Sequence, residues 1–119
     1  MKVLLVEDAE LVRATLAEGL EDAGLQVEEF SDPTEALRPP EAIDPPDVVV
    51  TDVDLGSTLN GFDVAVAAHS RWPAVRVILI SGLPADHTGQ RLDQRDRYLQ
   101  KPLSFTCLLR TIEELAKAP

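Results

Sequence analysis

Several features are scarce in this 119-residue sequence, and each scarcity argues against a class of protein. There is one cysteine, Cys107, so the chain forms no internal disulfide. Basic residues are few: eleven lysines and arginines stand against twenty-one acids, which gives a formal net charge of -10. This charge disfavours direct binding to nucleic-acid phosphates or anionic lipid. It favours a cation or a basic partner surface.

Long hydrophobic runs are also missing. The apolar start from Val3 to Val6 is interrupted by Glu7 and Asp8 before it could form a signal peptide or a membrane span. We therefore expect a soluble, cytoplasmic protein. The 45% of hydrophobic residues still suffices for a core. The length fits one domain over residues 1–119, and we expect no output domain in this chain.

Short apolar runs rich in β-branched residues alternate with helical patterns along the sequence. We expect strands at residues 3–6, 27–30, 48–50, 75–80 and 97–100. The second strand is half polar, which suits the edge of a sheet. We expect helices at residues 12–20, 33–38, 62–71 and 105–116, with Asp32 and Ser104 as N-caps of the second and the last. The alternation predicts an open α/β sheet of parallel strands joined by right-handed crossovers.

One connection has little helical signal. The segment from Leu83 to Arg95 contains proline and glycine but few apolar residues. We therefore expect the helix before the fifth strand to be weak or short.

Polar side chains follow four of the expected strands. They belong to Glu7 and Asp8, Asp52, Ser81 and Lys101, and Ser81 and Lys101 are followed by Gly82 and Pro102. In open parallel sheets, ligands bind outside the carboxyl ends of the strands, so these groups are predicted to meet. Taken singly, each is more often a turn, cap or surface residue. Together they bring three carboxylates, a hydroxyl and an ammonium group to one edge of the sheet.

Converging carboxylates repel one another unless a cation joins them. Mg²⁺ suits such a site because it is held by one or two carboxylates and keeps positions open for phosphate oxygens. One carboxylate can then attack phosphorus and form an aspartyl phosphate. Lys101 and Ser81 would contact the phosphoryl oxygens. The pattern therefore predicts phosphoryl transfer.

The ordered set of residues resembles the receiver domain of two-component response regulators over essentially the whole chain. The matching residues are Glu7-Asp8, Asp52, Ser81, Tyr98 and Lys101-Pro102. The resemblance implies a flavodoxin-like (βα)5 fold, a three-layer sandwich with a parallel sheet in the order 2-1-3-4-5.

The resemblance also implies a role for each matching position. Asp52 would be the phosphoacceptor. Glu7, Asp8 and Asp52, with the main-chain carbonyl of Asp54, would hold Mg²⁺ or Mn²⁺.

Three further positions match the family. Ser81 and Tyr98 match its switch pair, whose hydroxyl and ring move on phosphorylation. Lys101 matches the phosphate-contacting lysine, and the bond from it to Pro102 is commonly cis in the family.

The implied function is a phosphorylation-dependent signalling module of a two-component system or phosphorelay. Its donor would be a histidine kinase or a histidine phosphotransfer protein, and its output a downstream protein target. Self-phosphotransfer and autodephosphorylation are expected rather than turnover as an ordinary enzyme. The resemblance also admits a homodimer linked to phosphorylation. Asp54 and Leu83 border the family's route for hydrolytic water, so we expect an altered phosphoryl lifetime in a direction that stays open.

Two other hypotheses use the same residues. Asp52 and Asp54 resemble the nucleophile and acid of haloacid dehalogenase-type phosphatases. In that family, however, the motif follows the first strand, whereas here it follows the third. The other hypothesis is a receiver-shaped interaction module that has lost phosphorylation, and the complete residue set argues against it.

Four residues outside the motif also carry expectations. We expect His69 and His87 on the surface, since neither has a partner at metal-ligand spacing. Cys107 is expected to pack in the last helix, and Trp72 to pack at the end of the third.

Overall fold

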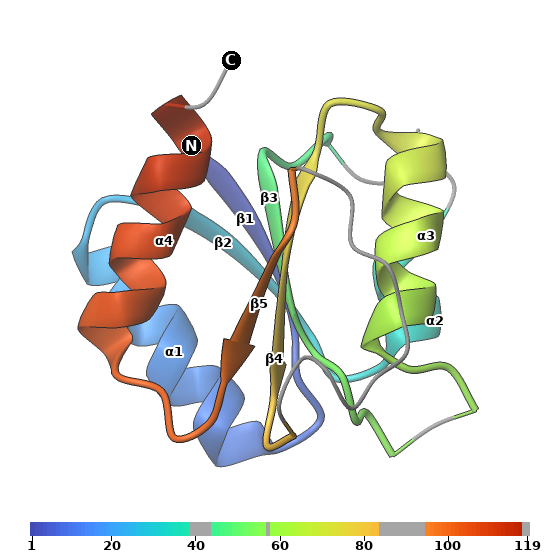
Figure 1. Cartoon of the computed structure of the whole chain (residues 1–119), viewed down its shortest axis with the longest axis horizontal. Coiled ribbons are helices and arrows are strands. Elements are labelled where there is room, and N and C mark those ends of the chain that lie inside the picture. The colour runs from blue at the N-terminus through green and yellow to red at the C-terminus, as the bar shows by residue number, and fades with distance from the viewer. Residues whose placement is uncertain (39–43, 57, 84–94, 118–119) are drawn as a thin grey trace.

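The computed structural model describes residues 1–38, 44–56, 58–83 and 95–117 (Figure 1). Its elements in chain order are β1 (Lys2–Val6), α1 (Glu10–Asp22), β2 (Gln26–Phe30), α2 (Pro33–Ala36), β3 (Val48–Asp52), α3 (Gly61–Arg71), β4 (Arg76–Ser81), β5 (Arg97–Gln100) and α4 (Phe105–Lys117). All the strand pairs are parallel, and the five-stranded sheet has the order β2-β1-β3-β4-β5. The predicted sheet is therefore confirmed.

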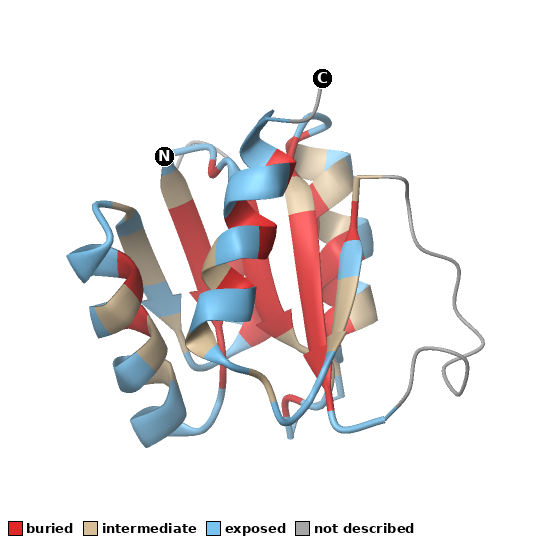
Figure 2. Ribbon diagram, turned by 60° about the vertical axis from the view of Figure 1, so that its left-hand side comes forward, coloured by how far each residue is buried: buried red, intermediate tan, exposed pale blue. Residues whose placement is uncertain are grey.

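The helices form a layer on each side of the sheet. In Figure 1, α1 and α4 lie on one face, and α2 and α3 lie on the other. Successive side chains of a strand point to opposite faces, so a strand covered on both sides must be apolar throughout. Val3 and Leu5 of β1 pack with α1 and α4, whereas Leu4 and Val6 pack with α2 and α3. This is why the central strands read as unbroken apolar runs, and Figure 2 shows them buried.

The boundaries of most elements match the sequence patterns. β2 and β5 are the edge strands, and β5 covers the predicted residues 97–100. The second helix, expected at residues 33–38, is α2, which has four residues. The Asp32 side chain caps it by accepting the Thr34 N–H at 2.8 Å. Ser104 likewise accepts the Cys107 N–H, at 3.1 Å.

The weak helix predicted between Leu83 and Arg95 falls almost wholly on residues 84–94, outside the described residues. His87 lies outside them too. Among the described residues there are four helices, one of them short.

Two single-residue predictions are wrong. Cys107 is exposed, because it lies in the first turn of α4, before the first buried residue, Leu108. His69 is half-buried, and its Nε2 lies 2.8 Å from Oδ1 of the buried Asp96. His69 follows the buried Ala65 by one turn of α3, so it lies beside the face that meets the sheet. The expectation for Trp72 is confirmed, since it is buried directly after α3.

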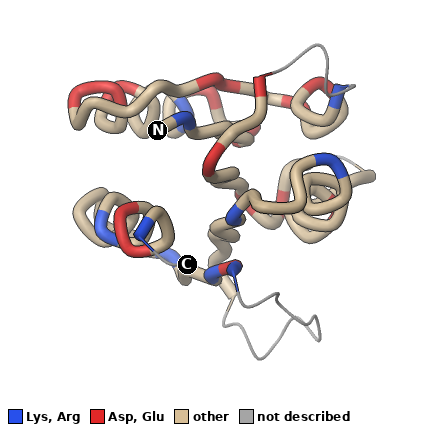
Figure 3. The backbone as a smooth tube through the Cα atoms, turned by 90° about the horizontal axis from the view of Figure 1, so that it is seen from above, with Lys and Arg blue, Asp and Glu red and all other residues tan. Residues whose placement is uncertain are grey.

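Charge is spread over several elements (Figure 3). Helix α1 carries four acids and one arginine, whereas α4 carries two acids and two basic residues. None of the described helices has the length and apolar content to cross a bilayer.

Candidate functional site

Three acidic side chains meet at the carboxyl ends of the central strands. Glu7 and Asp8 directly follow β1, and Asp52 is the last residue of β3, which lies beside β1 in the sheet. One carboxylate oxygen from each can be chosen so that all lie within 4.8 Å of one another. Glu7 is buried, Asp52 is half-buried and Asp8 is exposed. The site thus grades from protein interior to solvent over these three residues.

The Glu7 carboxyl group is held in an environment that disfavours its charge. Burial is the main cause, followed by the negative charge of Asp52 and a hydrogen bond with it. The negative charge of Asp8 adds to the effect, while the positive charge of Lys101 opposes it. Together they raise the pKa of Glu7 to about 7. Near neutral pH the protonated and ionised forms of Glu7 are therefore both populated.

Lys101 brings a positive charge to the same edge. It directly follows β5, and its Nζ lies 3.1 Å from Oδ2 of Asp52. Its main-chain N–H donates to the carbonyl of Ser81 at 2.7 Å, which fixes the end of β5 against the end of β4. The bond between Lys101 and Pro102 is cis, as the resemblance implied. The structure therefore brings Lys101 to Asp52 across the sheet.

Ser81 and Tyr98 are joined through the backbone of Leu83. Oγ of the buried Ser81 accepts the Leu83 N–H at 3.1 Å. The Tyr98 hydroxyl donates to the carbonyl of Leu83 at 2.7 Å. The Ser81 hydroxyl thus bonds the N–H of Leu83, and the Tyr98 hydroxyl bonds the carbonyl of the same residue.

Two glycines shape the chain after Asp52. Gly56 has a φ of +61°, in the left-handed region that favours glycine, and a Cβ there would stand 3.0 Å from Oδ2 of Asp8. Gly61 begins α3 so close to β3 that a Cβ would lie 2.5 Å from the carbonyl oxygen of Asp52. Asn60 and Asp63 form a capping box that anchors this helix start. The phosphoacceptor candidate therefore has α3 packed directly against its backbone.

The donor set fits a hard divalent cation. Carboxylate oxygens are the protein ligands that Mg²⁺ prefers. Oε2 of Glu7 is buried and has no hydrogen-bond partner among the described residues, which is costly unless the group is protonated or meets a cation. The side chain of Asp54 is engaged elsewhere, because its Oδ1 accepts the Gly56 N–H at 3.3 Å. Its main-chain carbonyl as a metal ligand stays a prediction.

Sequence reasoning missed Arg13. Its Nη1 donates to the main-chain carbonyl of Glu7 at 2.9 Å, and its Nε lies 3.6 Å from Oε1 of Glu29 on β2. Arg13 thus ties the acidic loop to α1 and to the edge strand. The signal available in the sequence was a basic residue about one and a half helical turns after the acidic pair Glu7-Asp8.

A cavity of about 270 Å³ borders the acidic group. Glu7, Asp52 and Lys101 form its polar wall. Its remaining wall is mostly apolar and includes Val12 and Leu16 of α1 and Pro102 and Leu103 after β5. The site therefore opens beside a surface that can take an apolar group.

Comparison with known proteins gives a consistent assignment. The sequence profile of the response regulator receiver domain matches residues 3–113. Among curated proteins, no sequence matches the chain significantly.

Solved structures match over nearly the whole chain. A response regulator receiver protein from Sinorhizobium medicae WSM419 has a TM-score of 0.89 and 25% identity, over 99% of this chain and 95% of its own. For the Vibrio cholerae chemotaxis protein CheY4 the values are 0.83 and 26%, over 96% and 97%. For the signal receiver domain of a modulated diguanylate cyclase from Desulfovibrio desulfuricans G20 they are 0.80 and 31%, over 97% and 92%. This chain belongs to the response regulator receiver domain family.

Proposed function

We propose that Asp52 accepts a phosphoryl group from a phosphohistidine donor in a Mg²⁺-dependent reaction, and that the aspartyl phosphate alters a partner-binding face. Family membership already assigns the chain to two-component signalling, in which receiver domains interact with histidine kinases and downstream effectors. One observation carries the proposal. The carboxylates of Glu7, Asp8 and Asp52 converge, and Lys101 lies 3.1 Å from Asp52.

The chemistry needs one bond made and one broken. A carboxylate oxygen of Asp52 attacks phosphorus, the P–N bond to the donor imidazole breaks, and the nitrogen keeps the bonding pair. Lys101, already beside Asp52, would leave its carboxylate and neutralise a phosphoryl oxygen. Glu7, Asp8, Asp52 and the carbonyl of Asp54 would hold Mg²⁺, which supplies charge neutralisation and orientation of the phosphoryl oxygens when bound.

The change at Asp52 would reach the surface through Ser81 and Tyr98. The Ser81 hydroxyl accepts the Leu83 N–H in the unphosphorylated protein. We expect it to turn toward a phosphoryl oxygen on Asp52, which would weaken that hydrogen bond. Leu83 also anchors the Tyr98 hydroxyl, so the ring loses part of its restraint. The altered face would then bind the downstream partner differently.

The donor protein would dock beside the site. The apolar wall of the 270 Å³ cavity continues onto α1, where Leu11 and Val12 are exposed. Such a surface suits an apolar helix face that presents the phosphohistidine.

The direct test is intact mass measurement after incubation with acetyl phosphate, with and without Mg²⁺. We expect one base-labile phosphoryl group in the native protein with metal, and none in Asp52→Asn. Asp54→Asn is the matched control: it removes the neighbouring acid but keeps the backbone carbonyl, so it should still be phosphorylated.

Other outcomes favour the other hypotheses. An unchanged mass despite bound Mg²⁺ would indicate an interaction module that works without phosphorylation. Rapid turnover of an unrelated phosphate ester would indicate a phosphatase of the haloacid dehalogenase type.

Lys101→Ala separates metal binding from the response. Lys101 contacts Asp52 through a charged hydrogen bond and offers no metal ligand, so calorimetric titration should show Mg²⁺ affinity retained. The phosphorylated variant should lack the conformational change that the native protein shows by NMR. Lys2→Ala, at the opposite end of the sheet, should leave both properties unchanged. Loss of Mg²⁺ binding in Lys101→Ala would contradict the role given to this lysine.

A further inference from the structure

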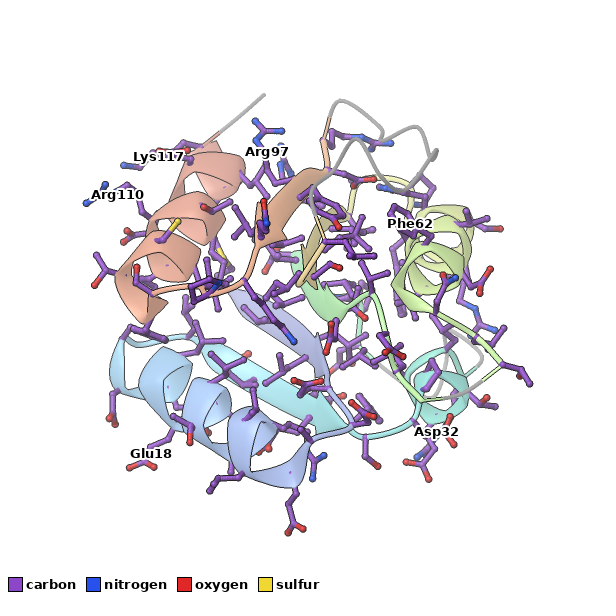
Figure 4. All side chains as sticks on the ribbon, turned by 60° about the horizontal axis from the view of Figure 1, so that its bottom comes forward. Glu18, Asp32, Phe62, Arg97, Arg110 and Lys117 are labelled. Carbon is purple, nitrogen blue, oxygen red and sulfur yellow. The ribbon has the colours of Figure 1, made fainter. Side chains whose placement is uncertain are left out.

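Two contacts hold the ring of Tyr98. Its hydroxyl donates to the carbonyl of Leu83 at 2.7 Å. Its ring stacks on Phe62, with centroids 6.4 Å apart and planes inclined by 21°. Both rings are partly buried against the core cluster on the α3 face of the sheet. Figure 4 labels Phe62, which lies between α3 and the strands. The orientation of Tyr98 therefore depends on Phe62 as well as on Leu83.

Phe62 is fixed to the backbone beside Asp52. It is the second residue of α3, and its N–H donates to the side chain of Asn60 at 2.8 Å. The N–H of the preceding Gly61 donates to the carbonyl of Val53 at 2.8 Å. Gly61 also has no room for a Cβ against the Asp52 carbonyl. A shift of the phosphoacceptor backbone would thus move the first turn of α3 and the ring of Phe62.

The contact with Phe62 is independent of Ser81. The route from Ser81 to Tyr98 runs through the Leu83 backbone, and it weakens when the serine hydroxyl turns away. The route through Gly61 and Phe62 involves neither the hydroxyl nor Leu83. Tyr98 is therefore reached by two separate connections, one from Ser81 at the end of β4 and one from the backbone at Asp52 and Val53.

We propose that Phe62 is a positioning residue for Tyr98, and that the first turn of α3 is a second route from the phosphorylation site to the switch tyrosine. The first half concerns the unphosphorylated protein and stands on the contacts alone. The second half rests on the proposed function. An aromatic pair contributes stabilisation beyond that of the area it buries. Losing the pair with Phe62 should therefore change the ratio of two orientations of the Tyr98 ring about twofold to tenfold.

The chain contains a single tyrosine, which makes the test direct. Incorporation of 3-fluorotyrosine gives one ¹⁹F signal that reports Tyr98 alone. We compare the native protein with Phe62→Leu and Phe62→Met, two variants that keep an apolar side chain without the ring. The matched control is Phe105→Leu, which removes a partly buried ring on the opposite face of the sheet.

Without a phosphodonor, both Phe62 variants should shift the ¹⁹F signal and change the ratio of its conformers. Phe105→Leu should leave the signal as in the native protein. With acetyl phosphate and Mg²⁺, the Phe62 variants should be phosphorylated at the native rate, since Phe62 lies outside the site formed by Glu7, Asp8, Asp52 and Lys101. Their ¹⁹F response to phosphorylation should be smaller than the native one.

A native ¹⁹F spectrum in both folded Phe62 variants would overturn the proposal, as would an equal shift in Phe105→Leu. A native response to phosphorylation in spite of a shifted resting signal would overturn its second half. Failure of the proposed function has a different signature. In that case native protein gains no phosphoryl group, while the resting spectra of the Phe62 variants still differ from native.

Discussion

Replacing Gly61 with alanine should lower the free energy of unfolding by about 2 kcal/mol. The added Cβ would lie 2.5 Å from the Asp52 carbonyl oxygen and 2.8 Å from the Cα of Val53. Both obstacles are backbone atoms, so no side chain can rotate away. Overpacking of this kind costs about 1–3 kcal/mol or more, while the better helix propensity of alanine returns at most about 1 kcal/mol. Urea denaturation followed by fluorescence of the single tryptophan, Trp72, measures the loss.

The same substitution at Gly82 is the control. Among the described residues, no atom lies within 4 Å of a Cβ at this position, and Gly82 does not have a positive φ. Gly82→Ala should therefore change stability by less than about 0.5 kcal/mol. Gly61→Ala should also slow phosphorylation, because the shift needed to admit the methyl group displaces the backbone of Asp52. Equal stability of the two variants would show that α3 does not pack against Asp52 as described.

The fold was predictable because its central strands are covered on both faces. Val48–Val50 and the run before Ser81 had to be apolar throughout, and continuous runs separated by helical spacing leave few topologies open. Strand ends were less predictable. β3 continues through Thr51, which is buried and whose hydroxyl donates to the Asp52 carbonyl. In the sequence, a polar residue whose side chain bonds the backbone of the next residue looks like the end of a strand.

Residues that act through long-range pairing were missed for a common reason. His69 and Asp96 are 27 positions apart, and only the packing of α3 beside β4 and β5 brings them together. Asp96 also accepts the Val77 N–H at 3.2 Å, which explains how a carboxylate can be buried there. Neither periodicity nor spacing encodes such a contact.

The acidic residues and Lys101 could be predicted because of the topology. Parallel strands deliver their carboxyl ends to one edge, and the strand order that the receiver-domain resemblance implies brings Glu7, Asp8 and Asp52 to Lys101. What the order does not reveal is the gradient of burial between them. Glu7 is 5% exposed, and this burial is the main cause of its raised pKa.

The second large effect follows from that pKa. In metal-free protein, the contribution of Glu7 to stability should fall as the pH rises from about 4.5 to above 7. The pKa of Glu7 is raised from 4.5 to about 7 in the folded protein, so the folded state binds its proton more tightly than the unfolded state does. The stabilisation by that proton is complete below the unfolded pKa and is lost as pH rises through the folded one. The loss should amount to about 3 kcal/mol.

Glu7→Gln should remove this dependence, because an uncharged amide resembles the protonated acid at every pH. At pH 8 without metal, the variant should be more stable than the native protein by up to about 3 kcal/mol, and at pH 4 the two should be nearly equal. Denaturant titrations across this pH range measure the difference. Glu18→Gln is the control, since Glu18 is exposed on α1 and points away from the site in Figure 4.

Mg²⁺ should offset this difference in stability between the native protein and Glu7→Gln. A cation favours ionised Glu7, so metal binding should release a proton near neutral pH. It should stabilise the native protein more as the Mg²⁺ concentration rises further above the dissociation constant. Glu7→Gln lacks that charge and should gain less stability from the same Mg²⁺ concentration. Identical pH profiles for the native protein and Glu7→Gln without metal would contradict the raised pKa. Identical stabilisation by Mg²⁺ would instead remove Glu7 from the metal site and leave Asp8 and Asp52 to hold it.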